Sequence, residues 1–220
     1  MVHRTKLPDM ASVANSRGDA RLFAPSAERN SVPIVKTIQR IAPKSGQALE
    51  LASGTGQHIV KLASSLPNLS WLPSEVDEAR LKSISAWIQA ENLPNIKPPL
   101  YLDATETDWA KSLPQFDLIF LVNLFHLISW NEMKTLISEL PNVLKKNGNT
   151  LIYGPFMRSG VLTSAGDQNF HTSLIQKDPD IGYKDDLDML ELFANSGLLH
   201  LETVEMPANN LAFVLNNMLN

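Results

Sequence analysis

Apolar runs of strand length alternate with amphipathic segments of helix length along most of this chain. Gln47–Ala52 is predicted to be a short buried strand, and the glycine turn after it leads into a helical pattern over Gln57–Ser65. Leu69–Ser74 predicts a second strand, and Asp77–Glu91 predicts a helix with an apolar inner stripe. This alternation is typical of an α/β protein with a parallel sheet.

The middle of the chain continues the alternation. Pro98–Asp103 predicts a third strand, since proline is tolerated at a strand start. Phe116–Asn123 is a continuous apolar run, as expected of a central parallel strand that is covered on both faces. We expect a helix over Trp130–Leu144 with a stop at Gly148, and a fifth strand over Thr150–Tyr153.

The pattern loosens after this fifth strand. Residues 155–182 are rich in Ser, Gly, Asp and Asn, and we expect an ordered insertion or lid there. Asp185–Ser196 predicts a helix, and Leu198–Met206 and Leu211–Asn216 predict two strands joined as a hairpin. Strand–helix units followed by a hairpin predict a doubly wound, mostly parallel sheet that is closed by one antiparallel strand.

Length, charge and composition exclude several classes of protein. The 220 residues fit a flexible arm over residues 1–22 and a single domain over residues 23–220. Nineteen basic and 23 acidic side chains give a net charge of −4, which offers no electrostatic footprint for nucleic acid. With no cysteine and five scattered histidines, we expect no metal site. No signal peptide or membrane span is evident, so the expected location is the cytoplasm.

The sharpest local signal is the glycine loop that follows the first predicted strand. Its small residues let a ligand approach the backbone and its N–H groups closely. A dinucleotide fingerprint needs a third glycine where Ile59 stands, and the Gly-Lys-Ser/Thr of a Walker loop is absent too. The loop residues that we expect to contact a cofactor are Ala52, Ser53, Gly54 and Gly56.

An acidic residue, Glu50, stands four positions before Gly54, at the end of the same strand. A carboxylate suits a cationic ligand better than a pyrophosphate, because like charges repel at short range. S-adenosylmethionine carries both an ammonium and a sulfonium, so we expect this cofactor on the loop. The alternative is that Glu50 caps the following helix and the glycines only make a turn.

Two further acidic residues stand at the ends of the next two predicted strands. Glu75 lies where a doubly wound fold places a carboxylate on a ribose diol, and its alternative role is a surface carboxylate. Asp103 and the backbone of Ala104 are placed to read an adenine edge, although Asp103 or Thr105 could equally cap a helix. Strand ends of an open α/β sheet meet at one crevice, so the three carboxylates together favour an adenosyl cofactor.

Five stretches of the chain resemble the domain of unknown function 938 family, also called the methyltransferase-like protein 26 family. The resemblance implies a Rossmann-like, seven-stranded class I methyltransferase fold and an S-adenosylmethionine site, and it implies no particular methyl acceptor. One departure is Glu75, where the family commonly has Asp. The matching stretches are APSAERNSVPI (Ala24–Ile34), LELASGTGQH (Leu49–His58), WLPSEVD (Trp71–Asp77), YGPF (Tyr153–Phe156) and EMPANNL (Glu205–Leu211).

Candidate catalytic residues follow the fourth and fifth predicted strands. Methyl transfer from a sulfonium is an in-line displacement, so the protein mainly has to position the reactants and, where needed, accept a proton. Asn123 and His126 are best placed after the fourth strand, and His126 could instead pack against Trp130. Tyr153 and Arg158 follow the fifth strand, and Arg158 either binds a substrate anion or is solvated.

Polar residues near the two ends of the chain are weaker candidates. In class I folds an N-terminal helix often covers the cofactor, so Arg29 and Asn30 are expected to contact it, with helix capping and an exposed ion pair as the alternative. Asn209 and Asn210 in the last hairpin either approach the crevice or simply satisfy the turn.

These observations predict an enzyme that transfers a methyl group from S-adenosylmethionine to a small or medium polar molecule, with no nucleic acid or membrane as partner. A second hypothesis is a module of the same fold that binds the cofactor without turnover. A nicotinamide-dependent oxidoreductase is disfavoured by Glu50 and by the missing third glycine. The sequence does not indicate the methyl acceptor or the oligomeric state.

Overall fold

Residues 14–16 and 18–218 are described by the structure, which is a computed structural model. The chain divides into two units: the first runs to Asp103 and includes Phe116–Leu121, and the second contains Ala104–Gln115 and the chain from Val122 onward. Of the arm predicted over residues 1–22, residues 1–13 and 17 lie outside the described residues. Within the described residues, no helix is long and apolar enough to cross a membrane.

The first unit contains a short hairpin, three helices and four parallel strands. Its strand order is β5-β4-β3-β6, and the register pairs Ala48 with both Trp71 and Leu118. The elements are β1 (Asn15–Ser16), β2 (Leu22–Phe23), α1 (Pro25–Ile41), β3 (Gly46–Leu51), α2 (Gln57–Ser65), β4 (Leu69–Glu75), α3 (Glu78–Glu91), β5 (Leu100–Tyr101) and β6 (Phe116–Val122).

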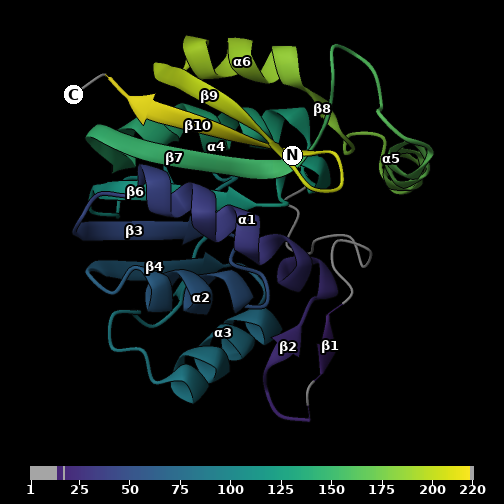
Figure 1. Ribbon diagram of the computed structural model, residues 1–220. Helices are drawn as coiled ribbons and strands as arrows, with labels where there is room; N and C mark the ends of the chain where they lie inside the picture. Colours follow the sequence, from purple (N-terminus) through teal and green to yellow (C-terminus); the bar gives the residue numbers. More distant parts are fainter. Residues whose placement is uncertain (1–13, 17, 219–220) are drawn as a thin grey trace. The chain divides into compact units, whose positions relative to one another are not determined.

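Helices α1 and α2 lie side by side on the face of β3 and β4 that Figure 1 turns toward the reader. The core under them is apolar and close-packed, because parallel strands bury both of their faces. Trp71 on β4 and Phe120 on β6 are both fully buried, and their rings meet edge to face with centroids 6.0 Å apart. The carboxyl ends of β3 and β4 therefore have a rigid support.

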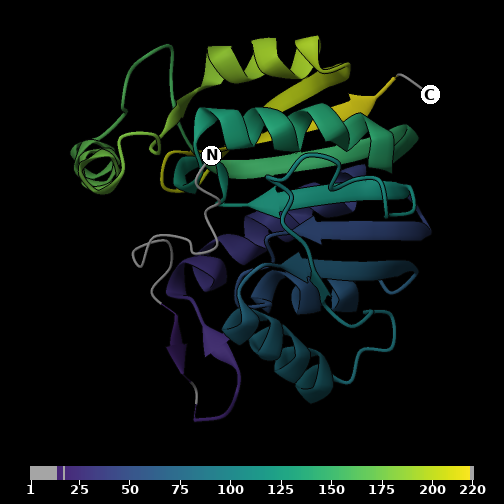
Figure 2. The same cartoon turned by 180° about the vertical axis from the view of Figure 1, so that it is seen from behind.

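The second unit contains antiparallel strands in the order β7-β10-β9, and the short β8 pairs in parallel with β7. Helices α4 and α6 pack on one face of these strands, while α5 stands apart from them (Figure 2). The elements are η1 (Phe125–Leu127), α4 (Trp130–Val143), β7 (Leu144–Met157), α5 (Ala165–Lys177), β8 (Lys184–Asp185), α6 (Asp186–Asn195), β9 (Leu198–Met206) and β10 (Asn210–Asn217).

The predicted α/β class, with mostly parallel strands and an antiparallel C-terminal strand, is confirmed. Four strands of the first unit and β7, β10 and β9 of the second make the expected seven, and β8 is an addition. Predicted and observed bounds of α2 and of β9 are identical. That agreement reflects the glycine pair before α2 and the tight turn after β9.

One predicted stop in the second half is wrong. The helix predicted over Trp130–Leu144 is α4, which ends at Val143; β7 begins at Leu144, so Gly148 lies within a strand and does not stop the helix. Tertiary bonds set this boundary, since the side chain of Asn217 donates to the carbonyls of Pro141 and Leu144. The insertion predicted over residues 155–182 contains helix α5, which the polar composition of this segment did not predict. The helix begins with a side-chain cap, because the hydroxyl of Ser164 accepts a hydrogen bond from Asp167 N at 3.1 Å.

Helix α3 begins with a side-chain cap that should contribute to stability. The carboxylate of Asp77 accepts a hydrogen bond from the backbone N–H of Arg80 at 2.9 Å. Asp77→Ala leaves this N–H without its partner, so we expect a loss of about 1 kcal/mol in the free energy of unfolding. Urea denaturation measures the loss, and Glu78→Ala, which leaves this bond in place, is the control. Equal stability of the wild-type protein and Asp77→Ala would show that the cap is not stabilising.

Two histidines are buried in their neutral form. His58 on α2 shares a hydrogen bond of 2.8 Å between its Nε2 and the Oδ1 of Asn30 on α1. Burial lowers the pKa of His58 to about 4, with the charge of Lys61 as a second cause and that of Glu28 acting against it. Burial also lowers the pKa of His126 to about 3, with the charge of Lys184 as a second cause. Charging either ring inside the fold is unfavourable, because desolvation destabilises the charged form.

Acid should therefore destabilise the protein below about pH 6.5. There the unfolded histidines bind protons and the folded ones do not, so stability falls with pH by at most about 1.4 kcal/mol per pH unit for each ring. We expect His126→Gln to flatten the slope of unfolding free energy between pH 6 and 4.5, and to leave the slope between pH 7 and 8 unchanged. Urea denaturation across this pH series is the measurement. A slope below pH 6 that matches the wild type would contradict the neutral, buried ring.

Candidate functional site

The loop between β3 and α2 takes a left-handed backbone conformation at three positions. Ala52 has φ 52°, Gly54 φ 58° and Gly56 φ 91°. A Cβ atom on Gly56 would lie 3.0 Å from the Cα of Ile84 on α3, so this position has no room for a side chain. A Cβ atom on Gly54 would meet nothing closer than the guanidinium of Arg80 at 4.0 Å. The loop is therefore packed closely against α3 at Gly56 and leaves open space beside Gly54.

Hydrogen bonds join this loop to the end of β4. Ser53 N donates to the carbonyl of Ser74 at 2.8 Å, and Ser74 N donates to the hydroxyl of Ser53 at 3.1 Å. Gly54 N donates to Oε2 of Glu75 at 2.8 Å. The carboxyl ends of the two strands are thus held in one arrangement before any ligand arrives.

Glu50 lies at this edge with a side chain that is only 1% exposed. Its Oε2 is buried and has no hydrogen-bond partner within the described residues. Burial raises the pKa of Glu50 to about 8; a hydrogen bond from Ser53 acts against the rise, and the charge of Glu75 adds to it. Helix α2 has Gly56 as its N-cap, so Glu50 does not cap it. A buried carboxyl oxygen without a partner is costly, and a cationic group placed against it would remove that cost.

Glu75 is also 1% exposed, at the end of β4. Burial raises its pKa, although Arg80 and the N–H groups of Val76, Gly54 and Asp77 act in the opposite direction. Oε1 accepts from Val76 N at 2.8 Å and from Asp77 N at 3.4 Å. These bonds fix the carboxylate on the same loop that carries Gly54, so Glu75 is a buried group and the surface alternative is excluded.

Asp103 and Ala104 lie just beyond β5. In the described residues no helix begins at Asp103 or Thr105, and this removes the capping role as an explanation for Asp103. The strand before it is anchored to the same edge, since Leu102 N donates to the carbonyl of Glu75 at 3.2 Å. Ala104 is buried and belongs to the second unit. Their contact with an adenine stays a prediction.

The two N-terminal candidates take different positions on α1. Asn30 is buried, and its Oδ1 is bonded to His58, so it joins α1 to α2. Arg29 is exposed on the same helix. Asn30 does not cap the helix, and the exposed ion pair of this segment joins Glu28 to Lys61 at 2.7 Å. The role of Asn30 toward a cofactor stays a prediction.

The three catalytic candidates lie in the second unit. Asn123 follows β6 with φ 58°, and its N–H donates to the carbonyl of Tyr153 at 2.8 Å. The side chain of Tyr153 is 2% exposed within β7. His126 is 4% exposed, and its ring contacts those of Phe170 and Tyr183 at centroid distances of 5.6 and 6.3 Å. A ring with a pKa near 3 binds a proton weakly, so these observations favour packing over proton transfer for His126.

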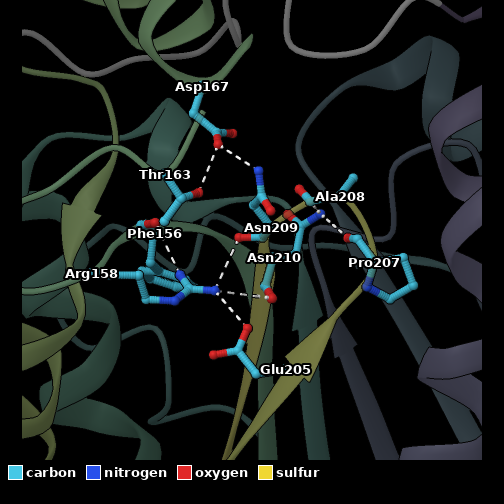
Figure 3. Close-up of polar contacts among 9 residues, drawn as sticks. All are labelled: Phe156, Arg158, Thr163, Asp167, Glu205, Pro207, Ala208, Asn209 and Asn210. Carbon is cyan, nitrogen blue, oxygen red and sulfur yellow. Dashed lines mark hydrogen bonds and ion pairs between the residues drawn. The ribbon is translucent and has the colours of Figure 1, made fainter. Parts of the chain in front are cut away.

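Arg158 braces the turn between β9 and β10. Its guanidinium donates to Glu205 Oε2 at 3.1 Å, to the carbonyl of Asn209 at 3.2 Å and to that of Phe156 at 3.1 Å (Figure 3). Asn209 and Asn210 both lie in or beside this turn, and the side chain of Asn210 donates to Pro207 O at 2.9 Å. The turn-forming role of the two asparagines therefore has direct support.

Asp167 on α5 is a second bracing residue that the sequence analysis missed. Its carboxylate accepts hydrogen bonds at 2.7 to 3.1 Å from four side chains, and one of them, Asn209, ties α5 to the β9–β10 turn (Figure 3). Burial acts to raise the pKa of Asp167, but these bonds outweigh it and lower the pKa. The insertion is thus ordered by its own polar contacts. The four donors are Ser164, Asn209, Thr163 and Tyr183.

The first unit thus brings together Glu50, Glu75 and the loop around Gly54, as the sequence predicted. A cavity of about 380 Å³ lies elsewhere in this unit. None of the three acidic candidates lines it, so we do not assign the cofactor to it. Its lining residues are Phe23, Glu28, Gln57, Val60, Lys61, Ser64, Ser65, Trp87 and Glu91.

Solved methyltransferases share this fold at low sequence identity. An O-methyltransferase family protein from Burkholderia thailandensis matches with a TM-score of 0.73 and 14% identity over 85% of this chain and 56% of its own. An O-methyltransferase family 2 protein from Planctomyces limnophilus, in complex with apigenin, gives 0.73 and 14% over 87% and 57%. Human N-acetylserotonin methyltransferase, in complex with S-adenosylmethionine, gives 0.67 and 12% over 87% and 58%.

This chain spans little more than half the length of these structures, so the likeness concerns the Rossmann-like methyltransferase fold alone. A family model matches this chain at the level of sequence over residues 21–217. That range includes the glycine loop, the buried carboxylates and the β9–β10 turn. The chain belongs to the family described as protein of unknown function DUF938.

Proposed function

We propose that this protein binds S-adenosylmethionine on the loop from Glu50 to Gly56 and transfers its methyl group to a small or medium polar molecule. The observation that carries the proposal is the buried, unpartnered Oε2 of Glu50 beside a glycine loop with open space at Gly54. A carboxyl group in this position fits a ligand with a positive charge. A solved protein of the same fold, human N-acetylserotonin methyltransferase, is in complex with this cofactor, which adds support.

Each residue of this edge has a distinct part in binding. Glu50 would accept from the ammonium of the cofactor, and the small residues Ala52, Ser53 and Gly54 would let it approach the backbone. Glu75 is fixed by three backbone N–H groups and would accept from the ribose hydroxyls with its remaining lone pairs. Asp103 and Ala104 would contact the adenine.

The cofactor supplies a methyl group on a sulfonium, which makes displacement by a nucleophile favourable. The chain then has to orient the acceptor and exclude water, and Asn123 and the 155–182 segment are the residues we assign to this task. The buried His126, with a pKa near 3, does not have to take a proton if the acceptor arrives deprotonated.

That same histidine favours a second candidate, a cofactor-binding module without turnover. Among the three catalytic candidates, His126 is the residue type that ordinarily titrates near neutral pH, and a pKa near 3 does not suit it to general base catalysis. Mass spectrometry of ligands that co-purify with the native protein would separate the candidates. A methylated small molecule beside S-adenosylhomocysteine supports the enzyme, and the adenosyl ligand alone supports the module.

The first test is binding. Calorimetric titration should show S-adenosylhomocysteine binding in the micromolar range, about −8 kcal/mol, with no comparable binding of NAD. Gly54→Val should abolish this binding, because its side chain enters the space beside the loop, and the circular dichroism spectrum should keep its wild-type form. Asp77→Ala, which removes only a helix cap, is the matched control and should bind normally. Tight binding of NAD with no binding of adenosyl ligands would overturn the proposal.

The second test uses the protonation of Glu50. Its carboxyl group is mostly protonated at pH 7, since its pKa is about 8, and a cation placed against it favours the ionised form. Cofactor binding at pH 7 should therefore release close to one proton, and affinity should rise with pH from 6 to 8 and level off above 8. Calorimetry in two buffers of different ionisation enthalpy measures the release. Glu50→Gln should bind more weakly and with no proton release; equal release from this variant would assign the proton to another group.

A further inference from the structure

Thr55, which stands between the two glycines of the loop, is held by two side chains from opposite directions. Its backbone carbonyl accepts a hydrogen bond of 2.8 Å from the hydroxyl of Ser83 on α3. Its own hydroxyl donates to Oε1 of Gln57, the first residue of α2, at 2.9 Å. The three residues are 5%, 0% and 2% exposed, so water does not compete for these bonds.

The same two side chains also hold the strand before α1. The hydroxyl of Ser83 accepts from Leu22 N at 2.8 Å, and Oε1 of Gln57 accepts from Ala24 N at 2.6 Å. The indole of Trp87 completes the arrangement by donating to the carbonyl of Leu22 at 3.0 Å. Residues 22–24 are thereby linked to the glycine loop through two buried side chains, although more than 25 positions separate them in the chain.

This arrangement matters because glycines stand on both sides of Thr55 in the loop. Gly54 and Gly56 both have positive φ, and a glycine on either side of Thr55 leaves many backbone conformations accessible. Ordering a loop on binding lowers affinity, whereas a loop that is already ordered binds more tightly. The two bonds to Thr55 restrict the residue that lies between the flexible positions.

We propose that Gln57 and Ser83 are positioning residues, which hold the glycine loop in its cofactor-binding conformation and make residues 22–24 part of the binding unit. This inference rests on the proposed function, because the loop is taken to be the cofactor site. Neither side chain needs to touch the ligand. Their effect passes through Thr55 to the N–H and Cα groups of Gly54.

A purely structural role predicts a different outcome. Hydrogen bonds that only stabilise the first unit would lower its melting temperature when removed, and ligand affinity measured well below that temperature would not change. Asn95 provides a matched comparison, since its side chain donates to the carbonyls of Ala63 and Leu69 within the same unit. Asn95→Ala should lower the melting temperature and leave affinity intact.

The experiment compares four variants by calorimetric titration with S-adenosylhomocysteine. Gln57→Met keeps the length of the side chain and removes its acceptor, while Gln57→Glu keeps an acceptor for Ala24 N and Thr55. We expect the Kd to rise roughly tenfold in Gln57→Met and in Ser83→Ala, as for one lost hydrogen bond, and to recover toward wild type in Gln57→Glu. Asn95→Ala is the fourth variant. Unchanged Kd values in Gln57→Met and Ser83→Ala would overturn the inference.

Amide hydrogen exchange in the ligand-free protein separates this inference from the proposed function. Exchange at Gly54, Thr55 and Gly56 should be faster in Gln57→Met and Ser83→Ala than in the wild type and in Asn95→Ala. A wild-type protein that binds no adenosyl ligand but shows this exchange pattern would refute the proposed function and retain the ordering of the loop. Equal exchange rates at these three residues in all folded variants would refute the positioning role. If Gln57→Met does not fold, the comparison of Ser83→Ala with the wild type tests the positioning role by itself.

Discussion

The close approach of the β3–α2 turn to helix α3 is the constraint on which the candidate site depends. Gly56 packs against the Cα of Ile84 with no space for a side chain, and its backbone is in a left-handed conformation, so both its packing and its φ favour glycine. This approach brings the loop within hydrogen-bond distance of both Ser83 and Glu75. A loop with two flexible glycines thereby has a defined conformation, and the open space at Gly54 lies beside two buried carboxyl groups.

The two carboxyl groups, Glu50 and Glu75, differ in how many hydrogen bonds compensate their burial. Burial raises the pKa of both Glu50 and Glu75, yet only Glu75 is compensated by backbone N–H groups. The unpartnered oxygen of Glu50 is a local cost in stability that a cationic ligand would relieve. In the second unit, Asp167 is the opposite case, because four donors satisfy its carboxylate and lower its pKa. We assign binding of the cation to Glu50 and structural bracing to Asp167.

Local chemistry was enough to predict the α/β class, the bounds of α2 and β9, and the loop of the candidate site. Glycines and small residues directly after an apolar run indicate a tight turn that a ligand can approach closely. Carboxylates at the ends of successive strands lie along one edge of any parallel sheet. Glu50, Gly54 and Glu75 do lie together at that edge. The family resemblance rested on the same stretches, and the match over residues 21–217 bears it out.

Only the tertiary structure decided what the remaining polar residues do, because their partners are distant in the chain. Nothing near Gln57 in the sequence indicates that it accepts from Ala24, and nothing near Arg158 indicates that it braces the turn at Asn209. Burial likewise determines the pKa of His126, and the sequence alone left proton transfer and packing equally open. A sequence specifies which groups can bond, whereas the fold selects the pairs that meet and removes the competing water.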